Sequence, residues 1–357
     1  MTTKKISKQA PNDNDGRSKI ELSVSRHNIF KISKRLLFFM ALIVLVGAIS
    51  IGWHFNRDMK LARAHAANGS VLIATRCGPI EYQEAGEGIP LLMVHGSGGG
   101  HDQGMAFAGK LATKGVRVIA MSRFGYLRTP MPIDASPQAQ ADAHVCLLDA
   151  LNVRQAAILG GSAGAPSAMQ MAIRHPDRVS ALVLLVPLTY KPSTQADSAE
   201  VMSPSTERMM TRLLGSDFIF WVGLHVARDQ VIKYVLATPP EQFASASPQE
   251  RARINAILDN ILPVSARAQG LLSDTAVGKN MQRMSLELIH APTLIISTRD
   301  DRYGTYASAE YTASQIAGAK FIGFNEGGHV WVGHDEQIQA EILKLLITSK
   351  PISHIEK

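Results

Sequence analysis

Residues 156–169 read AAILGGSAGAPSAM and place one serine, Ser162, among glycines and alanines. An apolar run precedes this stretch and a helix-like run follows it, which would be unusual for a flexible linker. The alternative is a turn so sharp that only small residues fit around it. Gly160 and Gly164 stand two positions before and after the serine, where a strand and a helix nearly collide. The pattern therefore predicts a strand–turn–helix junction that exposes the Ser162 hydroxyl.

Apolar runs and helix-like stretches alternate on both sides of this junction. We expect strands over 71–76, 80–85, 90–95, 116–121, 155–160 and 179–186, and helices over 102–114, 137–151 and 163–175. The alternation stops near Pro187 and returns with strands over 292–297 and 320–324 and helices near 305–317 and 335–348. Such alternation is typical of a mostly parallel sheet covered by helices. The sequence thus predicts one α/β domain, residues 70–187 and 290–350, interrupted by a helical cap at 188–289.

The N-terminal part of the chain has a different character. Residues 1–35 carry nine of the 37 Lys and Arg residues and three of the 30 Asp and Glu residues, so most of the net charge of +7 lies there. Because the rest of the chain is nearly neutral, no basic face is expected, and nucleic-acid binding is not predicted. Residues 36–53 contain no charged residue and would span roughly 27 Å as a helix, at the short end of what crosses a bilayer.

The basic tail before this apolar run predicts a single-pass membrane anchor with a cytoplasmic N-terminus. Residues 54–69 would then be a polar linker, and the α/β domain would lie outside the cytoplasm, in the periplasm if the organism is a bacterium. A cleavable signal peptide is the nearest alternative, because Ala64, His65 and Ala66 have the small-x-small form that signal peptidase recognises. The long basic region before the run and the basic residues after it favour the uncleaved anchor.

A serine hydroxyl is a poor nucleophile unless a base takes its proton. His329 follows the last expected strand after two glycines and is our candidate base, whereas His334 is expected at the start of the closing helix. Asp301 follows the next-to-last strand and is our candidate for the carboxylate that orients the base, with Asp300 as the alternative. Neighbouring side chains leave a backbone in different directions, so we expect only one of the two to reach the histidine.

A glycine-rich segment, HGSGGG at residues 95–100, follows another expected strand. Its glycines would let backbone N–H groups point into the site without a Cβ in the way. We expect the N–H groups of Ala163 and of Ser97 or Gly98 to bind a developing oxyanion. A phosphate-binding loop is the alternative, but the segment lacks the Lys-Ser/Thr of a P-loop and the spacing of a dinucleotide site.

Three further polar residues near these segments have two interpretations each. Asp102 would either contact the substrate or cap the helix that begins beside it. Arg123 and Tyr126 would either line the pocket or lie in a solvated loop.

The chain has two cysteines, Cys77 in a strand-like run and Cys146 in an expected helix. Exposure outside the cytoplasm would permit a disulfide, but nothing in the spacing demands one. We therefore expect two separate apolar core residues.

The order of glycine loop, serine, aspartate and histidine resembles the α/β-hydrolase superfamily over residues 71–349. The segments RHPDRVSALVLL, after the Ser162 turn, and SRFGYLRTPMP, after the fourth strand, are similar to its lidded serine hydrolases, which include carboxylesterases, C–C bond hydrolases and prolyl-aminopeptidase-like enzymes. The resemblance implies an α/β-hydrolase fold, with an eight-stranded, mostly parallel sheet, flanking helices and a cap between strands six and seven. Thr298 departs from the pattern, since many members have glycine there, and this bears on the choice between Asp300 and Asp301.

The serine at the turn also distinguishes this chain from superfamily members that use a carboxylate nucleophile, the haloalkane dehalogenases and epoxide hydrolases. Ser162 would attack a carbonyl carbon, His329 would take its proton, and Asp301 would stabilise the resulting imidazolium. The expected substrate is a small-molecule carboxylic ester with an apolar acyl group, and no cofactor or metal is expected. Cleavage of a C–C or amide bond is the enzymatic alternative, and a non-enzymatic ligand receptor is a third hypothesis.

Overall fold

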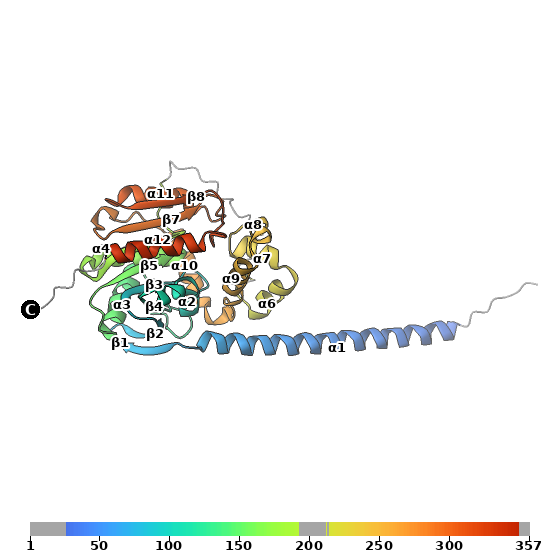
Figure 1. The fold of residues 1–357 in the computed structure, drawn as a ribbon. Helices are drawn as coiled ribbons and strands as arrows, with labels where there is room; N and C mark the ends of the chain where they lie inside the picture. Colours follow the sequence, from blue (N-terminus) through green and yellow to red (C-terminus); the bar gives the residue numbers. More distant parts are fainter. Residues whose placement is uncertain (1–25, 193–211, 213, 350–357) are drawn as a thin grey trace, which may run out of the picture. The chain divides into compact units, whose positions relative to one another are not determined.

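The computed structural model describes residues 26–192, 212 and 214–349 (Figure 1). Parts of three predicted segments lie outside the described residues: 1–25 of the basic tail, 193–211 and 213 of the cap, and residue 350 of the α/β domain. The chain divides into two compact units, Met1–His54 and Phe55–Lys357, and each is described by itself.

The second unit is built on one eight-stranded sheet with the order β1-β2-β4-β3-β5-β6-β7-β8. The strands are β1 (Val71–Thr75), β2 (Gly78–Ala85), β3 (Ile89–Val94), β4 (Val116–Met121), β5 (Ala156–Gly161), β6 (Val179–Leu185), β7 (Thr293–Thr298) and β8 (Lys320–Phe324). Strand β2 pairs antiparallel with β1 and β4, and the other pairs are parallel. The predicted eight-stranded, mostly parallel sheet is confirmed, and each strand boundary lies within two residues of its expected position.

Helices cover both faces of this sheet. One face packs against α3 (Pro137–Ala150), α4 (Ala165–Arg174) and α11 (Thr305–Gln315), and the other against α2 (His101–Ala108), the 3₁₀ helix η1 (Gly109–Lys114) and α12 (Asp335–Thr348). Side chains along β3 alternate between the two cores, with Leu92 and Val94 in one and Leu91 and Met93 in the other. Burial on both faces explains why the central strands β5, β6 and β7 are nearly continuous apolar runs in the sequence.

The chain between β6 and β7 forms a group of helices with an apolar core of its own. The described cap helices are α6 (Asp217–Val226), α7 (Arg228–Val235), α8 (Pro240–Ser245), α9 (Pro248–Asp259) and α10 (Ala268–Lys279). Buried side chains such as Phe220, Ile232, Ile254 and Leu258 form the centre of that core. These helices lie over the sheet edge at which β5, β7 and β8 end, so they can roof a site there (Figure 1).

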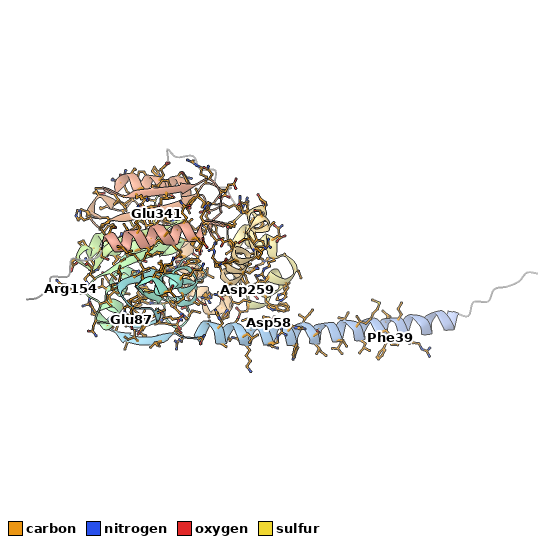
Figure 2. The ribbon with its side chains drawn as sticks, viewed as in Figure 1. Phe39, Asp58, Glu87, Arg154, Asp259 and Glu341 are labelled. Atoms are coloured by element: carbon orange, nitrogen blue, oxygen red, sulfur yellow. A yellow bond between two sulfur atoms is a disulfide. The ribbon has the colours of Figure 1, made fainter. Side chains whose placement is uncertain are left out.

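Helix α1 (Arg26–Ala67) is the one helix among the described residues that is long and apolar enough to cross a membrane. It does not stop where the expected linker 54–69 begins but continues to Ala67. Phe55, Met59 and Ala62 recur at helical spacing and face the cap core, in which Met59 is fully buried. Asp58 (labelled in Figure 2) accepts a 3.0 Å hydrogen bond from the Trp221 indole. The charged residues on the other helix face hid this apolar stripe from the sequence analysis.

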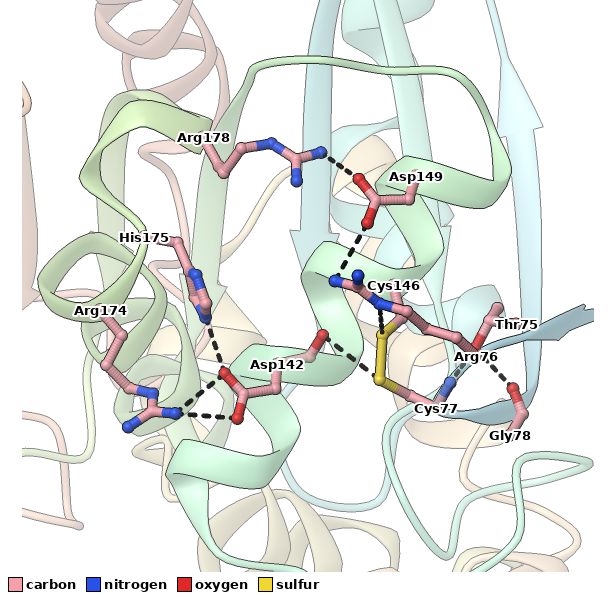
Figure 3. The surroundings of a disulfide bond; sticks show 10 residues. All are labelled: Thr75, Arg76, Cys77, Gly78, Asp142, Cys146, Asp149, Arg174, His175 and Arg178. Atoms are coloured by element: carbon pink, nitrogen blue, oxygen red, sulfur yellow. Dashed lines mark hydrogen bonds and ion pairs between the residues drawn. A yellow bond between two sulfur atoms is a disulfide. The ribbon is translucent and has the colours of Figure 1, made fainter.

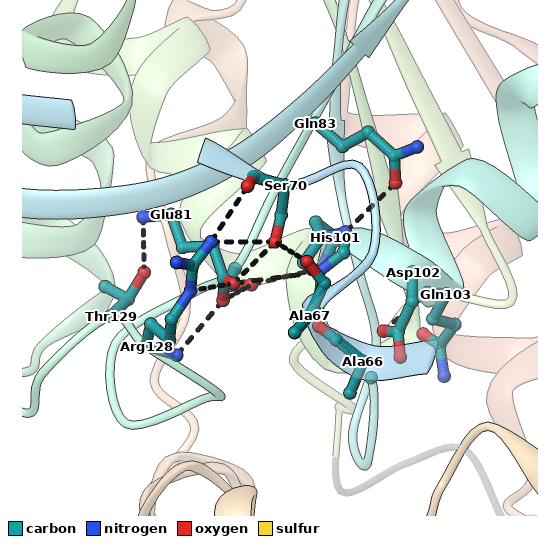
Figure 4. A network of polar contacts seen from close by, with 12 residues as sticks. Ala66, Ala67, Ser70, Glu81, Gln83, His101, Asp102, Gln103, Arg128 and Thr129 are labelled. Atoms are coloured by element: carbon teal, nitrogen blue, oxygen red, sulfur yellow. Dashed lines mark hydrogen bonds and ion pairs between the residues drawn. The ribbon is translucent and has the colours of Figure 1, made fainter. Parts of the chain in front are cut away.

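The C-terminal end of α1 is fastened to the sheet by a buried polar network (Figure 4). The His101 imidazole donates through Nε2 to the Ala66 carbonyl oxygen at 2.9 Å. The buried Glu81 carboxylate on β2 accepts from Ser70 Oγ at 2.9 Å and from Arg128 Nε at 2.6 Å. Residues 55–67 are therefore a packed part of the second unit.

Cys77 and Cys146 form a disulfide, with an S–S distance of 2.01 Å and a Cα–Cα distance of 6.0 Å (Figure 3). The expectation of two separate core cysteines is wrong. Cys77 is exposed in the turn between β1 and β2, whereas Cys146 is buried on α3. The two residues meet because the β1–β2 hairpin lies beside α3, a tertiary contact across 69 residues that sequence spacing does not encode.

Candidate active site

Ser162 lies at the sharp turn between β5 and α4, where the sequence predicted it. Its φ of +47° is in the left-handed region, which is costly for a residue with a side chain and is held here by the surrounding backbone. A Cβ at position 160 would lie 2.8 Å from the Ala168 Cβ, and one at position 164 would lie 2.6 Å from the His95 carbonyl oxygen. Glycine is therefore required at both positions for the turn to form.

His329 lies between Ser162 and Asp301. Its Nε2 atom is 2.9 Å from Ser162 Oγ, and its Nδ1 atom is 2.8 Å from Asp301 Oδ2. Because a carboxylate can only accept, Nδ1 carries the proton of the neutral imidazole and Nε2 is free to accept from the serine hydroxyl. The structure thus brings together the three side chains that the sequence analysis selected, one after each of the strands β5, β7 and β8.

The two neighbouring aspartates have different partners. Asp301 is buried, and besides His329 its carboxylate accepts from the Tyr303 N–H at 2.9 Å and from Thr305 Oγ1. Asp300 instead accepts from two backbone N–H groups in the loop before His329, those of Gly327 at 3.1 Å and Gly328 at 2.8 Å. Asp301 is therefore the carboxylate in contact with the imidazole, whereas Asp300 is hydrogen-bonded within the loop that carries it.

Thr298, the departure from the family pattern, also stabilises the loop that carries His329. Its hydroxyl donates to the Gly328 carbonyl oxygen at 2.8 Å. The Tyr303 ring, which the sequence analysis did not select, packs edge-on against the His329 ring with 4.8 Å between centroids. These contacts hold the imidazole in place without taking up its Nε2 lone pair.

Most of the N–H groups in the glycine loop already have acceptors. Gly96 donates to Gln103 Oε1 at 2.9 Å, Gly98 to the Tyr126 hydroxyl at 3.4 Å, and Gly99 to the Gly96 carbonyl oxygen at 3.3 Å. The Ser97 N–H donates to no group in the part of the chain that the structure describes. Of the two expected loop donors, Ser97 thus has no acceptor for its N–H among the described residues, whereas the Gly98 N–H is taken up by the Tyr126 hydroxyl.

The His95 side chain holds this loop through hydrogen bonds at both ring nitrogens. Its buried ring donates from Nδ1 to the Gly96 carbonyl oxygen at 2.7 Å and accepts at Nε2 from the Arg123 N–H at 2.9 Å. Burial, together with the Arg123 charge, holds the pKa of His95 well below its ordinary value. The ring is therefore neutral, as its one donated and one accepted hydrogen bond require.

Asp102 does not line the cavity beside Ser162. It is buried, and its Oδ2 atom lies 2.7 Å from Nη2 of the equally buried Arg267. Burial, the largest single cause, would raise the pKa of Asp102, but the Arg267 charge and hydrogen bonds, with smaller contributions from His101 and the Gln103 N–H, together outweigh it and the net shift is downward. Neither interpretation from the sequence describes this residue, since the N-cap of α2 is Gly100 and the carboxylate pairs with the cap segment instead.

A cavity of about 80 Å³ opens at Ser162 and His329. Its lining is mainly apolar, with Phe107 and Trp331 from the core and a roof formed by Val235, Leu236, Ile257, Ile261 and Leu271. No Lys, Arg, Asp or Glu lines it within residues 26–192, 212 and 214–349. The sequence analysis missed this roof because helical periodicity alone does not separate side chains that face a cavity from those that face the cap core.

The comparisons with known proteins agree with this architecture. The sequence matches the alpha/beta hydrolase fold family over residues 89–332. A 2-hydroxymuconate semialdehyde hydrolase from Pseudomonas sp. (strain CF600) is 31% identical over 261 residues, which cover 69% of this chain and 82% of that protein.

Solved structures show the same fold. An alpha/beta hydrolase fold protein from Nakamurella multipartita is 28% identical, with a TM-score of 0.61 and coverage of 78% of this chain and 98% of that one. The esterase EaEST from Exiguobacterium antarcticum is 21% identical, with a TM-score of 0.57 and the same coverage, and it shares the fold alone. The family match extends over more than half of the chain and includes the Ser162 turn and His329. This chain belongs to the α/β-hydrolase fold family.

Proposed function

We propose that this protein is a membrane-anchored serine hydrolase that cleaves a carboxylic ester with an apolar acyl group. The main support for the proposal is the chain of two hydrogen bonds from Ser162 Oγ to His329 and from His329 to Asp301, with distances of 2.9 and 2.8 Å. It opens into an apolar cavity lined by Ser97, whose N–H has no acceptor among the residues that the structure describes. Such a line activates a serine for acyl transfer.

In the first half of the reaction, Ser162 Oγ attacks the ester carbonyl carbon while its proton passes to His329 Nε2. The oxyanion of the tetrahedral intermediate accepts hydrogen bonds from the Ala163 and Ser97 N–H groups. The C–O bond to the alcohol then breaks, and the same Nε2 proton goes to the leaving oxygen. Asp301 stabilises the imidazolium between these two transfers.

In the second half, His329 takes a proton from a water molecule that attacks the acyl-enzyme. The resulting intermediate collapses, the bond to Ser162 Oγ breaks, and the proton returns to that oxygen. The products are a carboxylic acid and the free serine, so no cofactor or metal is needed for the balance of atoms or electrons.

The cavity lining supports an ester over the second candidate, cleavage of a C–C bond. A dienoate substrate carries a carboxylate, and a binding site for an anion is expected to provide a cation. None of the described residues that line the cavity is Lys or Arg. The 31% identity to a 2-hydroxymuconate semialdehyde hydrolase favours the second candidate, so the two must be compared directly.

The test is a substrate panel with the full-length protein in detergent. We expect p-nitrophenyl butyrate and hexanoate to be hydrolysed with kcat/KM at least about 100-fold above that for 2-hydroxy-6-oxo-6-phenylhexa-2,4-dienoate, because a dienoate would bring an unpaired carboxylate into an apolar cavity. The Ser162→Ala protein should lose both activities. A preference for the dienoate would reject the ester proposal, and equal turnover by wild type and Ser162→Ala would reject serine catalysis altogether.

A pair of aspartate variants separates the two neighbouring carboxylates. Asp301→Asn should lower kcat by about 10³–10⁴-fold, because an amide no longer stabilises the imidazolium or sets the Nδ1–H tautomer. Asp300→Asn keeps one acceptor for the loop and should leave kcat within about tenfold of wild type. Steady-state ester kinetics of both variants measure this, and an Asp300→Asn loss as large as that of Asp301→Asn would contradict the assignment.

We propose further that α1 is retained as a membrane anchor, with the second unit outside the cytoplasm. Cleavage after Ala66 would remove Phe55 and Met59 from the cap core and the Ala66 carbonyl from His101, which argues against a cleaved signal peptide. The disulfide between Cys77 and Cys146 supports an oxidising compartment.

Topology is tested by protease digestion of spheroplasts that express a C-terminally tagged protein. We expect external protease to digest the second unit in intact spheroplasts while a cytoplasmic marker survives, because the basic tail retains the N-terminus inside. Mass spectrometry of the membrane fraction should find the intact N-terminus. Protection until lysis would reverse the orientation, and a mature chain that begins after Ala66 would establish the signal-peptide alternative.

A further inference from the structure

A buried carboxylate of the cap, that of Asp274, is hydrogen-bonded to the glycine loop of the core. Asp274 lies in the middle of α10, and its carboxylate accepts four hydrogen bonds. Two come from the Arg123 guanidinium at 2.7 Å each, one from the Tyr126 hydroxyl at 2.5 Å and one from Ser97 Oγ at 2.8 Å. All three partners belong to core loops that follow β3 and β4, so this carboxylate joins the cap to the core.

Two of these hydrogen bonds act directly on the loop that is to bind the oxyanion. The first holds the side chain of Ser97, the residue whose N–H is unpaired. The second holds the Tyr126 hydroxyl, whose oxygen accepts the Gly98 N–H. The carboxylate thereby fixes the peptide units on both sides of Ser97, one through a side chain and one through a tyrosine.

The charges and proton positions fit this arrangement. Burial, the largest single cause, would lower the pKa of Arg123, but the Asp274 charge, the hydrogen bonds to Asp274 and the contact with Tyr126 together outweigh it. The net shift is upward, so the guanidinium stays charged. Burial and the Asp274 charge raise the pKa of Tyr126 well above its ordinary value. The tyrosine therefore keeps its proton, donates it to the carboxylate and leaves a lone pair for the Gly98 N–H.

A second ion pair fastens the next part of the loop to the same cap segment. Arg267, directly before α10, donates through Nη1 to the Gly99 carbonyl oxygen and through Nη2 to Asp102 at 2.7 Å. The cap thus contacts the glycine loop directly at Ser97 and Gly99, and through the Tyr126 hydroxyl at Gly98. A buried ion pair commonly contributes little net stability, because desolvation offsets the attraction, so its placement is better explained by the geometry it imposes.

We propose that Asp274 is a positioning residue that holds the Ser97 N–H in place for the oxyanion, and that the cap is therefore part of the catalytic machinery as well as the roof of the cavity. This inference rests on the proposed serine-hydrolase function. Asp274 does not line the Ser162 cavity and acts through Ser97 and Tyr126. Its loss should therefore weaken binding of the transition state and leave binding of the substrate nearly unchanged.

The test uses the full-length protein and three substitutions that each remove part of this connection: Asp274→Asn, Tyr126→Phe and Ser97→Ala. The matched control is Thr275→Ala, on the same helix, where the hydroxyl donates to the Leu271 carbonyl oxygen and is hydrogen-bonded to none of the loop residues 95–100. Three quantities are measured for each: kcat and KM for p-nitrophenyl butyrate, and the inhibition constant of butylboronic acid, whose tetrahedral serine adduct places an oxygen in the oxyanion position. The fraction of active protein is determined by titration with a fluorophosphonate.

We expect Asp274→Asn and Tyr126→Phe to lower kcat per active site by about 10- to 100-fold and to weaken boronate inhibition by a similar factor, with KM within about threefold. Ser97→Ala should show a smaller loss, below about tenfold, and Thr275→Ala none. If Asp274→Asn does not fold, Tyr126→Phe and Ser97→Ala decide the question, since each removes a single hydroxyl.

Two different results would contradict two different proposals, the role of Asp274 and the serine-hydrolase function. A wild-type protein that hydrolyses the ester, with variants whose kcat and boronate inhibition are unchanged per active site, would overturn the role of Asp274 alone. A wild-type protein that neither hydrolyses the ester nor reacts with the fluorophosphonate would overturn the proposed function, and the role of Asp274 with it. A loss of Vmax that disappears once the rate is divided by the concentration of titrated active sites would also reject the positioning role.

Discussion

The hydrogen bonds on the two sides of the His329 ring are the interaction on which the site depends. A carboxylate at Nδ1 determines which nitrogen carries the proton, and only then can Nε2 accept from Ser162. Each of the three groups is held by its own support: the left-handed turn for Ser162, the Tyr303 and Thr305 contacts for Asp301, and the Asp300 and Thr298 contacts for the His329 loop. The parallel sheet brings them together because β5, β7 and β8 end at the same edge.

The cap contributes more than a lid to this arrangement. Its roof makes the cavity apolar, and its buried Asp274 and Arg267 contact the glycine loop that lines the cavity at Ser162. The cap core in turn contains Met59, which belongs to the helix that continues from the apolar N-terminal segment. In the second unit, the end of α1, the cap and the glycine loop are therefore connected through packed side chains and buried hydrogen bonds.

The features that could be predicted from the sequence are those with a local signature. Continuous apolar runs revealed the strands, small residues around Ser162 revealed the turn, and the positions of Asp301 and His329 after strands indicated that they would meet it. Cys77 and Cys146 could not be paired in this way, since their contact depends on where the β1–β2 hairpin lies. Asp274 carried no local signal, since it stands between Ser273 and Thr275 in a mixed helix and its partners are 148 to 177 residues away. Residues 54–67 were expected to be a linker because of their charged residues, although Phe55, Met59 and Ala62 recur at the spacing of one helix face.

The most direct measurement of the central claim is the site and rate of covalent labelling by a fluorophosphonate, read by peptide mass spectrometry. If the Ser162–His329–Asp301 line activates the serine, one phosphonylated residue should be found, at Ser162, and labelling of a His329→Ala protein should be slower by about 10³-fold or more. Absence of an adduct on folded wild-type protein, or labelling of Ser162 at an equal rate without the imidazole, would contradict the account.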